Sequence, residues 1–325
     1  MSRLLGITMG VGLDALLGDP RHHHPVAWFG TWASVVEGRL HADSRTRGVG
    51  YTALTLAPVM AVGVAAESAT RRHPLAHTVA TAMATWACLG AQSLAREGHT
   101  MADRLAAGDL EAARGQLPSL CGRSPGGMDA DDLGRATVES LAENTNDAVV
   151  STLFWGAVAG IPGLVLHRAV NTLDAMVGHR SPRYVRFGTA SARIDDVLGW
   201  VPARLTGALA CAVAPLVGGS PTRAWRTMRR DAHDHPSPNG GWCEAAWAGA
   251  LGVRLGGTNT YGDRVEVRGT LGDPGAPRPD STAVRRAASL VGWVTAAATL
   301  TLLTPATCQF LSRSSVPVPR RLVGP

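Results

Sequence analysis

Three carboxylates recur at intervals of four residues in the segment Glu139-Ser-Leu-Ala-Glu143-Asn-Thr-Asn-Asp147. Residues four apart share a helix face, so these side chains are expected to stack, and like charges at that spacing repel each other. A bound cation relieves such repulsion, and Mg²⁺ often uses one or two carboxylates together with substrate phosphates. We therefore predict that Glu139, Glu143 and Asp147 hold Mg²⁺. A solvated acidic helix face is the alternative interpretation.

A second polar group lies further along the chain, at Asn171-Thr-Leu-Asp174 and at Arg193-Ile-Asp195-Asp196. Asn171 and Asp174 are three residues apart, so a helix would turn both into one site. Arg193 stands beside an acidic pair, and its planar fork of donors suits a carboxylate or a phosphate. We predict substrate binding at all five positions. A purely structural ion pair is the alternative for Arg193.

A third group is Arg229-Arg230-Asp231-Ala-His-Asp-His235-Pro-Ser-Pro-Asn239-Gly-Gly-Trp. Two arginines beside a turn-forming loop predict an anion site built from side chains and backbone N–H groups. Arg229 and Arg230 would neutralise a phosphate, and Asn239 would help to bind it. Asp231 or His235 would then accept a proton during the reaction.

Two further candidate sites have simpler structural interpretations as alternatives. Glu244 is expected in the first turn of a helix, where a carboxylate is favoured in any case. Asp19 lies shortly before a run of three adjacent histidines that ends at His24, and such a run is not the spacing of metal ligands on a helix. The five cysteines form no CxxC pair, which argues against a zinc or thioredoxin-like site. No P-loop or Rossmann glycine motif occurs either.

These groups lie between long uncharged stretches, and that pattern predicts a membrane protein. Only 17% of the residues are charged, the net charge is +6, and all of the positively charged side chains are arginines. A membrane span needs about 20 apolar residues, and backbone groups in lipid must pair within a helix. A large soluble bundle is the alternative. The candidate spans are residues 48–66, 73–95, 148–166, 205–222 and 287–312.

We therefore predict an all-α integral membrane protein with about four to six embedded helices. Residues 1–312 would form one polytopic domain that includes a polar loop region at 223–286, and residues 313–325 a frayed tail. Amphipathic helices would fill the connecting segments, and an alternation at Arg264–Arg268 predicts one small β-hairpin. No basic run interleaves with aromatic residues, so nucleic-acid binding is not expected.

If all five stretches span, the segment 167–204 faces the opposite side from 96–147 and 223–286, and one site cannot collect every motif. The sequence Gly160-Ile-Pro162-Gly163 and Pro215 would allow the third and fourth stretches to dip in and return. We favour this second topology, because lipid tolerates broken helices where protein buries them. The arginines of 223–286 indicate that this loop is cytoplasmic.

Taken together, the motifs resemble the CobD/CbiB family of cobalamin biosynthesis, the adenosylcobinamide-phosphate synthases. The resemblance covers roughly residues 10 to 290, in the same order, and its stretches are long and specific. They read LLGDPRHHHPVAWFG, RATVESLAENTNDAVVSTLFWGAVAGIPG, RAVNTLDAMVGHRSPRYVRFGTASARIDDVLGWVPARL and RRDAHDHPSPNGGWCEAAWAGALGVRLGGTNTYG.

The resemblance implies a multi-pass enzyme of the cell membrane that joins adenosylcobyric acid to (R)-1-amino-2-propanol phosphate, or a related amino alcohol, through an amide. ATP would drive the step with Mg²⁺, and the corrinoid is the substrate. Other late corrin-pathway enzymes would be possible partners, besides the lipid bilayer. The family positions carried over are Asp19, His24, Glu139, Glu143, Asn144, Asp147, Asn171, Asp174, Arg193, Asp195, Asp196, Asp231, His235, Asn239 and Glu244.

From the residues alone, two other classes stay open. A Mg²⁺-dependent intramembrane prenyl or phosphoalcohol transferase would also place acidic clusters at helix ends. A corrinoid-binding transport or scaffold component would bind without chemistry. In the ligase interpretation, Glu143 and Asp147 join Asp231 and His235 as the catalytic residues.

Overall fold

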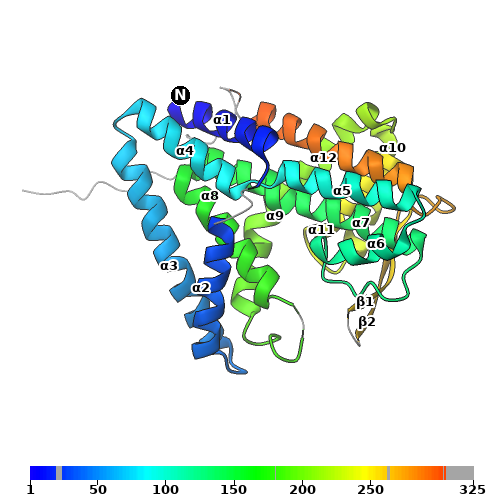
Figure 1. Ribbon diagram of the computed structural model, residues 1–325, viewed down its shortest axis with the longest axis horizontal. Coiled ribbons are helices and arrows are strands. Elements are labelled where there is room, and N and C mark those ends of the chain that lie inside the picture. Colours follow the sequence, from blue (N-terminus) through cyan, green and yellow to red (C-terminus); the bar gives the residue numbers. More distant parts are fainter. Residues whose placement is uncertain (20–23, 180, 262–263, 303, 305–325) are drawn as a thin grey trace, which may run out of the picture.

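Helices and one β-hairpin form the computed structural model, which describes residues 1–19, 24–179, 181–261, 264–302 and 304 (Figure 1). The α-helices are α1 (Ser2–Leu17), α2 (Pro25–Leu40), α3 (Arg45–Thr70), α4 (Pro74–Cys88), α5 (Ala91–Ala106), α6 (Leu110–Gln116), α7 (Ala130–Thr145), α8 (Ser151–Val177), α9 (Thr189–Val213), α10 (Pro221–Asp231), α11 (Gly240–Leu251) and α12 (Ser281–Leu302). A π-helical turn, Asn146–Val150, joins α7 to α8. Short 3₁₀ turns lie at Leu117–Ser119, Ala214–Val217 and Ala232–Asp234.

Local sequence signals fix where several helices begin. The side chains of His24, Ser44, Asp109, Asp129 and Ser220 each accept a hydrogen bond from a backbone N–H in the first turn that follows. These side chains satisfy backbone donors that have no partner inside the helix. A proline occupies the first helical position of both α2 and α10, where its fixed φ suits the helix.

The helices form two groups that meet at the core. In Figure 1, α1, α4, α5 and α12 run across the top, whereas α2, α3 and parts of α8 and α9 extend downward from them. α1 packs on α4, and α5 packs on α12. α11 lies in the core, where every residue from Gly240 to Leu251 except Trp242 is buried and Trp247 is fully so.

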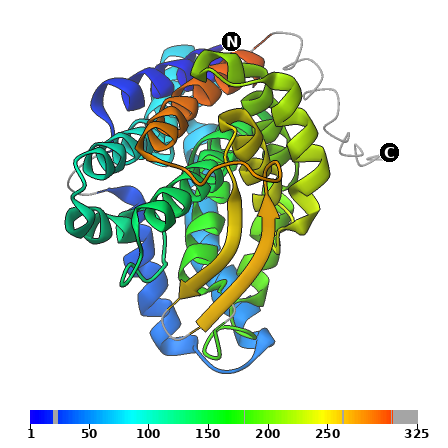
Figure 2. The same ribbon diagram turned by 90° about the vertical axis from the view of Figure 1, so that its right-hand side faces the viewer.

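The two strands are β1 (Leu255–Tyr261) and β2 (Arg264–Leu271), which pair antiparallel beside α7 and α11 (Figure 2). Their register shifts between Gly256 and Gly257, and Gly256 has a φ of 79° that favours glycine. The predicted hairpin is thereby confirmed. Its expected turn residues, Gly262 and Asp263, lie outside the described residues.

Three helical stretches are long and apolar enough to cross a membrane: Arg45–Thr70, Ala130–Val177 and Thr189–Val217. In the most apolar window of α3, only 22% of residues are buried inside the protein, which leaves most of that helix for lipid. The predicted all-α membrane fold is confirmed. The predicted span 48–66 lies within α3.

Two of the predicted spans are interrupted in the structure. Residues 73–95 divide between α4 and α5, because the backbone is extended at Leu89 and α4 ends at Cys88. α4 has 15 residues, about 22 Å, and is too short to cross about 30 Å of hydrocarbon. Residues 205–222 divide between α9 and α10, where Gly218 takes the left-handed conformation.

Other segments also differ from their predicted extents. The segment 167–204 is largely helical, because α8 continues to Val177 and α9 begins at Thr189. α12 begins at Ser281, earlier than predicted, and ends at Leu302. The rest of the predicted span to residue 312 and the predicted tail 313–325 lie outside the described residues, apart from Thr304.

α8 folds back on itself at Gly160, where φ is 67° and ψ is −147°. Thr152 Oγ1 lies 3.5 Å from His167 Nδ1, although these residues are 15 positions apart and a straight helix would separate them by about 22 Å. A Cβ on Gly163 would lie 2.2 Å from the carbonyl oxygen of Trp155, so the two arms touch. α8 is therefore a helical hairpin with its turn at Gly160.

Candidate active site

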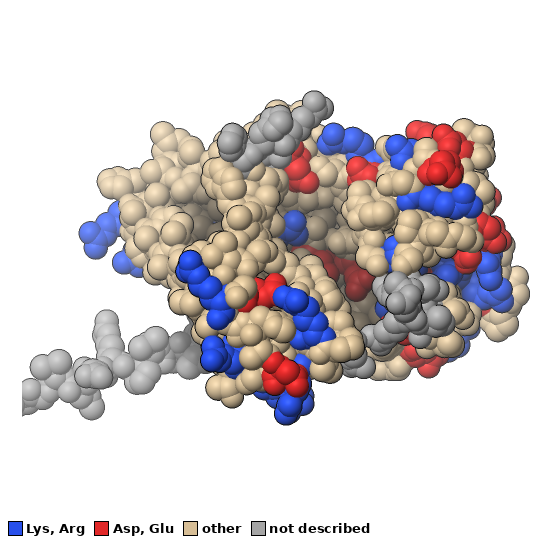
Figure 3. All heavy atoms as spheres, turned by 60° about the horizontal axis from the view of Figure 1, so that its bottom comes forward, with Lys and Arg blue, Asp and Glu red and all other residues tan. Residues whose placement is uncertain are grey.

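Five carboxylates line one polar cleft. Acidic side chains gather at the bottom of a hollow on the face seen in Figure 3. The acidic residues of the cleft are Glu143, Asp147, Asp174, Asp195 and Asp196, and its other lining residues include Asn146, Ser237, Asn239 and Cys243. The structure thus brings together acidic residues from two predicted polar segments and adds Ser237 and Asn239 from a third.

The fold of α8 explains how Asp147 and Asp174 meet. Asp147 lies 13 residues before Gly160 and Asp174 lies 14 residues after it, so the two arms carry these residues to the same level. α9 begins near this level and adds Asp195 and Asp196. The segment 167–204 therefore reaches the same cleft as the segment 96–147.

Amide side chains hold the carboxylates in place. Asn146 Nδ2 donates to Asp147 Oδ1 at 2.8 Å, and Thr206 Oγ1 lies 3.3 Å from Asn146 Oδ1. Asn171 interacts with both Asp147 and Asp195. Asn146 could not be identified from spacing, because its role depends on α9 approaching from another part of the chain.

The loop before α11 closes one side of the cleft. Asn239 Nδ2 donates to the backbone oxygen of Asp196 at 2.9 Å. Asn239 Oδ1 accepts from Arg204 at 3.1 Å, and the Arg204 guanidinium lies between the rings of Trp200 and Trp242, 4.2 and 4.8 Å from their centroids. A Cβ on Gly199 would come within 2.8 Å of Asn239 Nδ2, so only glycine lets the loop approach this closely.

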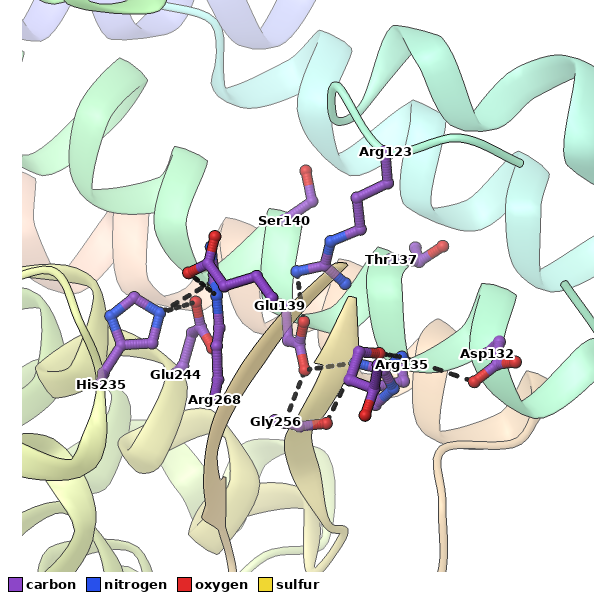
Figure 4. A network of polar contacts seen from close by, with 12 residues as sticks. Arg123, Asp132, Arg135, Thr137, Glu139, Ser140, His235, Glu244, Gly256 and Arg268 are labelled. Carbon is purple, nitrogen blue, oxygen red and sulfur yellow. Dashed lines mark hydrogen bonds and ion pairs between the residues drawn. The ribbon is translucent and has the colours of Figure 1, made fainter. Parts of the chain in front are cut away.

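His235 and Glu244 form a buried pair behind the cleft (Figure 4). His235 Nε2 lies 3.2 Å from Glu244 Oε1 and 3.1 Å from a guanidinium nitrogen of Arg268. Burial lowers the pKa of His235, but the charge and hydrogen bond of Glu244 outweigh it, and the pKa is raised overall. His235, Glu244 and Arg268 also interact electrostatically with Glu143, whose own side chain is exposed in the cleft.

Glu139 does not belong to the cleft, which corrects its predicted role as a metal ligand. Its carboxylate pairs with Arg123, lies 3.6 Å from Arg135 and accepts the backbone N–H of Gly256 at 2.6 Å (Figure 4). Arg135 also donates to the Gly256 oxygen at 3.0 Å. Glu139 is 1% exposed, so this cluster ties α7 to the β-hairpin. Arg135 lies four residues before Glu139 on α7, so helical spacing could have revealed that partner, whereas Arg123 has no such signal.

The predicted proton acceptor Asp231 is also engaged elsewhere. Arg230 binds both of its oxygens, at 2.5 and 2.9 Å, and the N–H of Gly272 donates to it at 2.8 Å. Arg230 contacts Asp273 as well, at 3.1 Å. Asp231 and Arg230 therefore hold the end of β2 against α10, while Arg229 is exposed. None of the three lines the cleft.

The remaining predicted residues have local roles in the structure. Asn144 donates to the Ser140 carbonyl at 2.9 Å, within α7. Arg193 is exposed and lies outside the cleft lining. His24 caps α2 by accepting from the N–H of Val26, and its Nε2 lies 3.9 Å from Asp19 Oδ1. Burial lowers the pKa of His24 despite the charge of Asp19.

The donor atoms of the cleft suit a hard cation. Among the described residues, no three His, Cys, Asp or Glu side chains lie together in a metal-binding arrangement. Mg²⁺ does not require one, since it keeps several waters and takes one or two carboxylates plus substrate phosphates. Carboxylate and amide oxygens predominate in the cleft, so the residues fit this ion.

Comparisons with known proteins agree with these motifs. The model of the CobD/Cbib protein family matches residues 7–291. The "Cobalamin biosynthesis protein CobD" of Mycobacterium tuberculosis is 49% identical over 278 residues, covering 85% of this chain and 88% of that protein. The protein of the same name from Geobacter metallireducens is 45% identical and covers 86% and 89%. No solved structure matches the chain. The chain belongs to the CobD/Cbib family.

Proposed function

We propose that this chain catalyses the ATP-dependent formation of an amide between adenosylcobyric acid and (R)-1-amino-2-propanol phosphate or a related amino alcohol. A role in cobalamin biosynthesis, and corrinoid substrates with it, follow from membership of the family. The finer assignment rests on one observation, the cleft in which five carboxylates from α7, the π-helical turn, α8 and α9 converge with Asn239. Such a cleft suits a reaction that gathers Mg²⁺ and phosphates beside a reacting carboxyl group.

The reaction has two bond-forming steps. The corrinoid carboxylate takes the terminal phosphoryl group of ATP and releases ADP. The amine nitrogen then forms the amide bond as the acyl–phosphate bond breaks, and inorganic phosphate leaves. The amine must also lose a proton, so the site has to provide a proton acceptor.

Mg²⁺, when bound, would neutralise charge on the phosphates. Asp147 and Asp195 are the proposed ligands, and Asn171 would orient both of them. Glu143 is the proposed proton acceptor because it is exposed in the cleft. The His235 side chain is only 4% exposed, so it would act on Glu143 from behind as a positioning residue.

We also propose a multi-pass plasma-membrane location with the cleft open to the cytoplasm. Four arginines, at 223, 226, 229 and 230, lie on α10, and cytoplasmic segments carry an excess of such residues. Labelling single cysteines placed at Arg226 and Arg229 from each side of the membrane tests this orientation. Reaction only from outside the cell would contradict it.

The direct test uses the purified full chain in detergent with adenosylcobyric acid, amino alcohol phosphate, ATP and Mg²⁺. We expect a product with the mass of adenosylcobinamide phosphate, and one ADP for each product. Glu143→Gln should abolish product formation. Glu111→Gln is the matched control, because the Glu111 side chain is 97% exposed on α6.

Three results would count against the proposal. Product formation without ATP would exclude the phosphorylated intermediate. Corrinoid binding without any product would indicate a scaffold or transport component. Full activity in Glu143→Gln would remove the assigned proton acceptor while leaving the overall reaction standing.

A further inference from the structure

A large apolar groove lies between α2, α3, α4 and the second arm of α8. Its volume is about 620 Å³, within the range that holds lipid- or drug-sized molecules. Trp28 and Trp32 on α2, Pro58 and Val62 on α3, and Ala84 on α4 contribute to its walls. None of these residues belongs to the polar cleft, so the groove is a separate feature.

The groove holds a single charge among the described residues that line it, the guanidinium of Arg168 on α8. Arg168 Nε is buried and has no hydrogen-bond partner, and Arg168 forms no salt bridge with any described residue. Arg168 as a whole is half-buried, and a partly desolvated charge is costly when no opposite charge repays the desolvation. The groove is therefore complementary to a ligand that carries an anionic group.

The surroundings of the groove indicate where that ligand comes from. The α3 wall belongs to a helix that is mostly uncovered, and Val62 is 69% exposed. Trp28 is 58% exposed and Trp32 39% exposed, and tryptophan is enriched where proteins meet the polar edge of a bilayer. A ligand that enters from this side is a lipid.

We propose that the groove binds one anionic phospholipid, with an acyl chain along α2 and α3 and the phosphate at Arg168. The apolar walls would bury the chain, and the guanidinium would form charge-assisted hydrogen bonds with phosphate oxygens. The site is independent of the ligase assignment. The lipid composition of the membrane would then affect how firmly α2 and α3 pack against α8.

Native mass spectrometry and tryptophan quenching test the site on the full chain. The probes are phosphatidylglycerol and phosphatidylcholine, each with brominated acyl chains, which quench tryptophan only at contact. We expect phosphatidylglycerol to bind and quench, and Trp28→Phe to remove part of that quenching. Arg168→Gln should weaken phosphatidylglycerol binding by roughly tenfold or more, because a charged hydrogen bond is lost.

Control variants separate binding from folding. Arg168→Lys keeps the charge and should keep the preference for phosphatidylglycerol. Arg39→Gln removes an exposed charge from the last turn of α2 and should leave binding unchanged. Ala84→Phe should fill the groove and remove the same part of the quenching that Trp28→Phe removes. Equal binding of both lipids, or unchanged binding in Arg168→Gln, would overturn the proposal.

Inorganic phosphate provides the remaining arm of the test. Because an acyl chain supplies much of the predicted affinity, millimolar phosphate should not displace the lipid. Displacement by phosphate alone would show that the groove serves a soluble phosphate compound instead, and would also overturn the proposal.

Discussion

Gly160 offers the sharpest test of how the cleft is assembled. Its φ of 67° and ψ of −147° lie in a region open essentially to glycine alone, and this conformation reverses α8. The broken ends of the two arms are capped by distant side chains. Arg3 reaches the carbonyl oxygens of Ala157 and Val158 at 3.4 and 3.5 Å, and Glu67 accepts the N–H of Ile161 at 3.1 Å.

Gly160→Ala should destabilise the protein through two effects. Backbone strain costs about 1–3 kcal/mol. A Cβ would also lie 2.7 Å from Glu67 Oε2 and 3.0 Å from an Arg3 nitrogen, and displacing Glu67 would leave the Ile161 N–H without a partner. An unsatisfied buried donor costs about 1–3 kcal/mol. The expected total is a loss of about 2–6 kcal/mol in the free energy of unfolding.

Denaturant unfolding in mixed micelles, followed by tryptophan fluorescence, measures this change. Gly292→Ala is the matched control, because Gly292 is exposed within α12 and an added Cβ meets nothing within 4 Å. That variant should gain about 0.5–1 kcal/mol, since alanine is the better helix former. A Gly160→Ala protein within about 0.5 kcal/mol of wild type would refute the account of the α8 turn.

Three further changes probe the other contacts. Glu139→Gln should lose about 3–5 kcal/mol of stability, because it breaks the buried ion pair with Arg123 and removes the charge beside Arg135, whereas Glu143→Gln should not; equal unfolding midpoints for the two would contradict this. Arg204→Lys should speed hydrogen exchange in residues 235–240 by roughly tenfold, since lysine cannot reproduce the planar stack, while the exposed Arg226→Lys should not. The protonated His235–Glu244 pair stabilises the fold below the unfolded pKa of 6.5, and this contribution is lost as the pH rises through the higher folded pKa of His235. Unfolding measured from about pH 6 to about pH 9 should show that loss, and Glu244→Gln should remove it.

The sequence predicted the acidic residues of the cleft better than their arrangement. Glu143 and Asp147 were expected to share a site, and both line the cleft. Spacing also placed Glu139 on their face, but a spacing rule applies to one helix in isolation. Arg123 and Arg135 instead pair with Glu139 on the buried side of the helix. The π-helical turn at Asn146–Val150 also interrupts the regular helix on which the rule depends.

The sequence indicated that the helix at α8 is broken, but it did not indicate which residues stabilise the reversal. Gly160-Ile-Pro162-Gly163 indicated a break, and the structure places the break at Gly160. Nothing local indicated Arg3 or Glu67 as caps, because they lie about 160 and 90 residues away along the chain. The contacts of Asp231 were not predicted for a related reason: its partner Gly272 follows β2, which is distant in sequence.

The position of the α8 turn relative to the cleft has a mechanical consequence. Carboxylates that line one cleft repel each other, by about 1–4 kcal/mol for a pair 4 Å apart depending on the surroundings. The arms that oppose this repulsion are about 20 Å long from Gly160 to Asp147 and to Asp174. Their turn is held by Arg3 and Glu67, which carry opposite charges and lie 3.3 Å apart. The ion pair at one end of the hairpin therefore helps to hold the acidic cluster at the other, and weakening either end should loosen both.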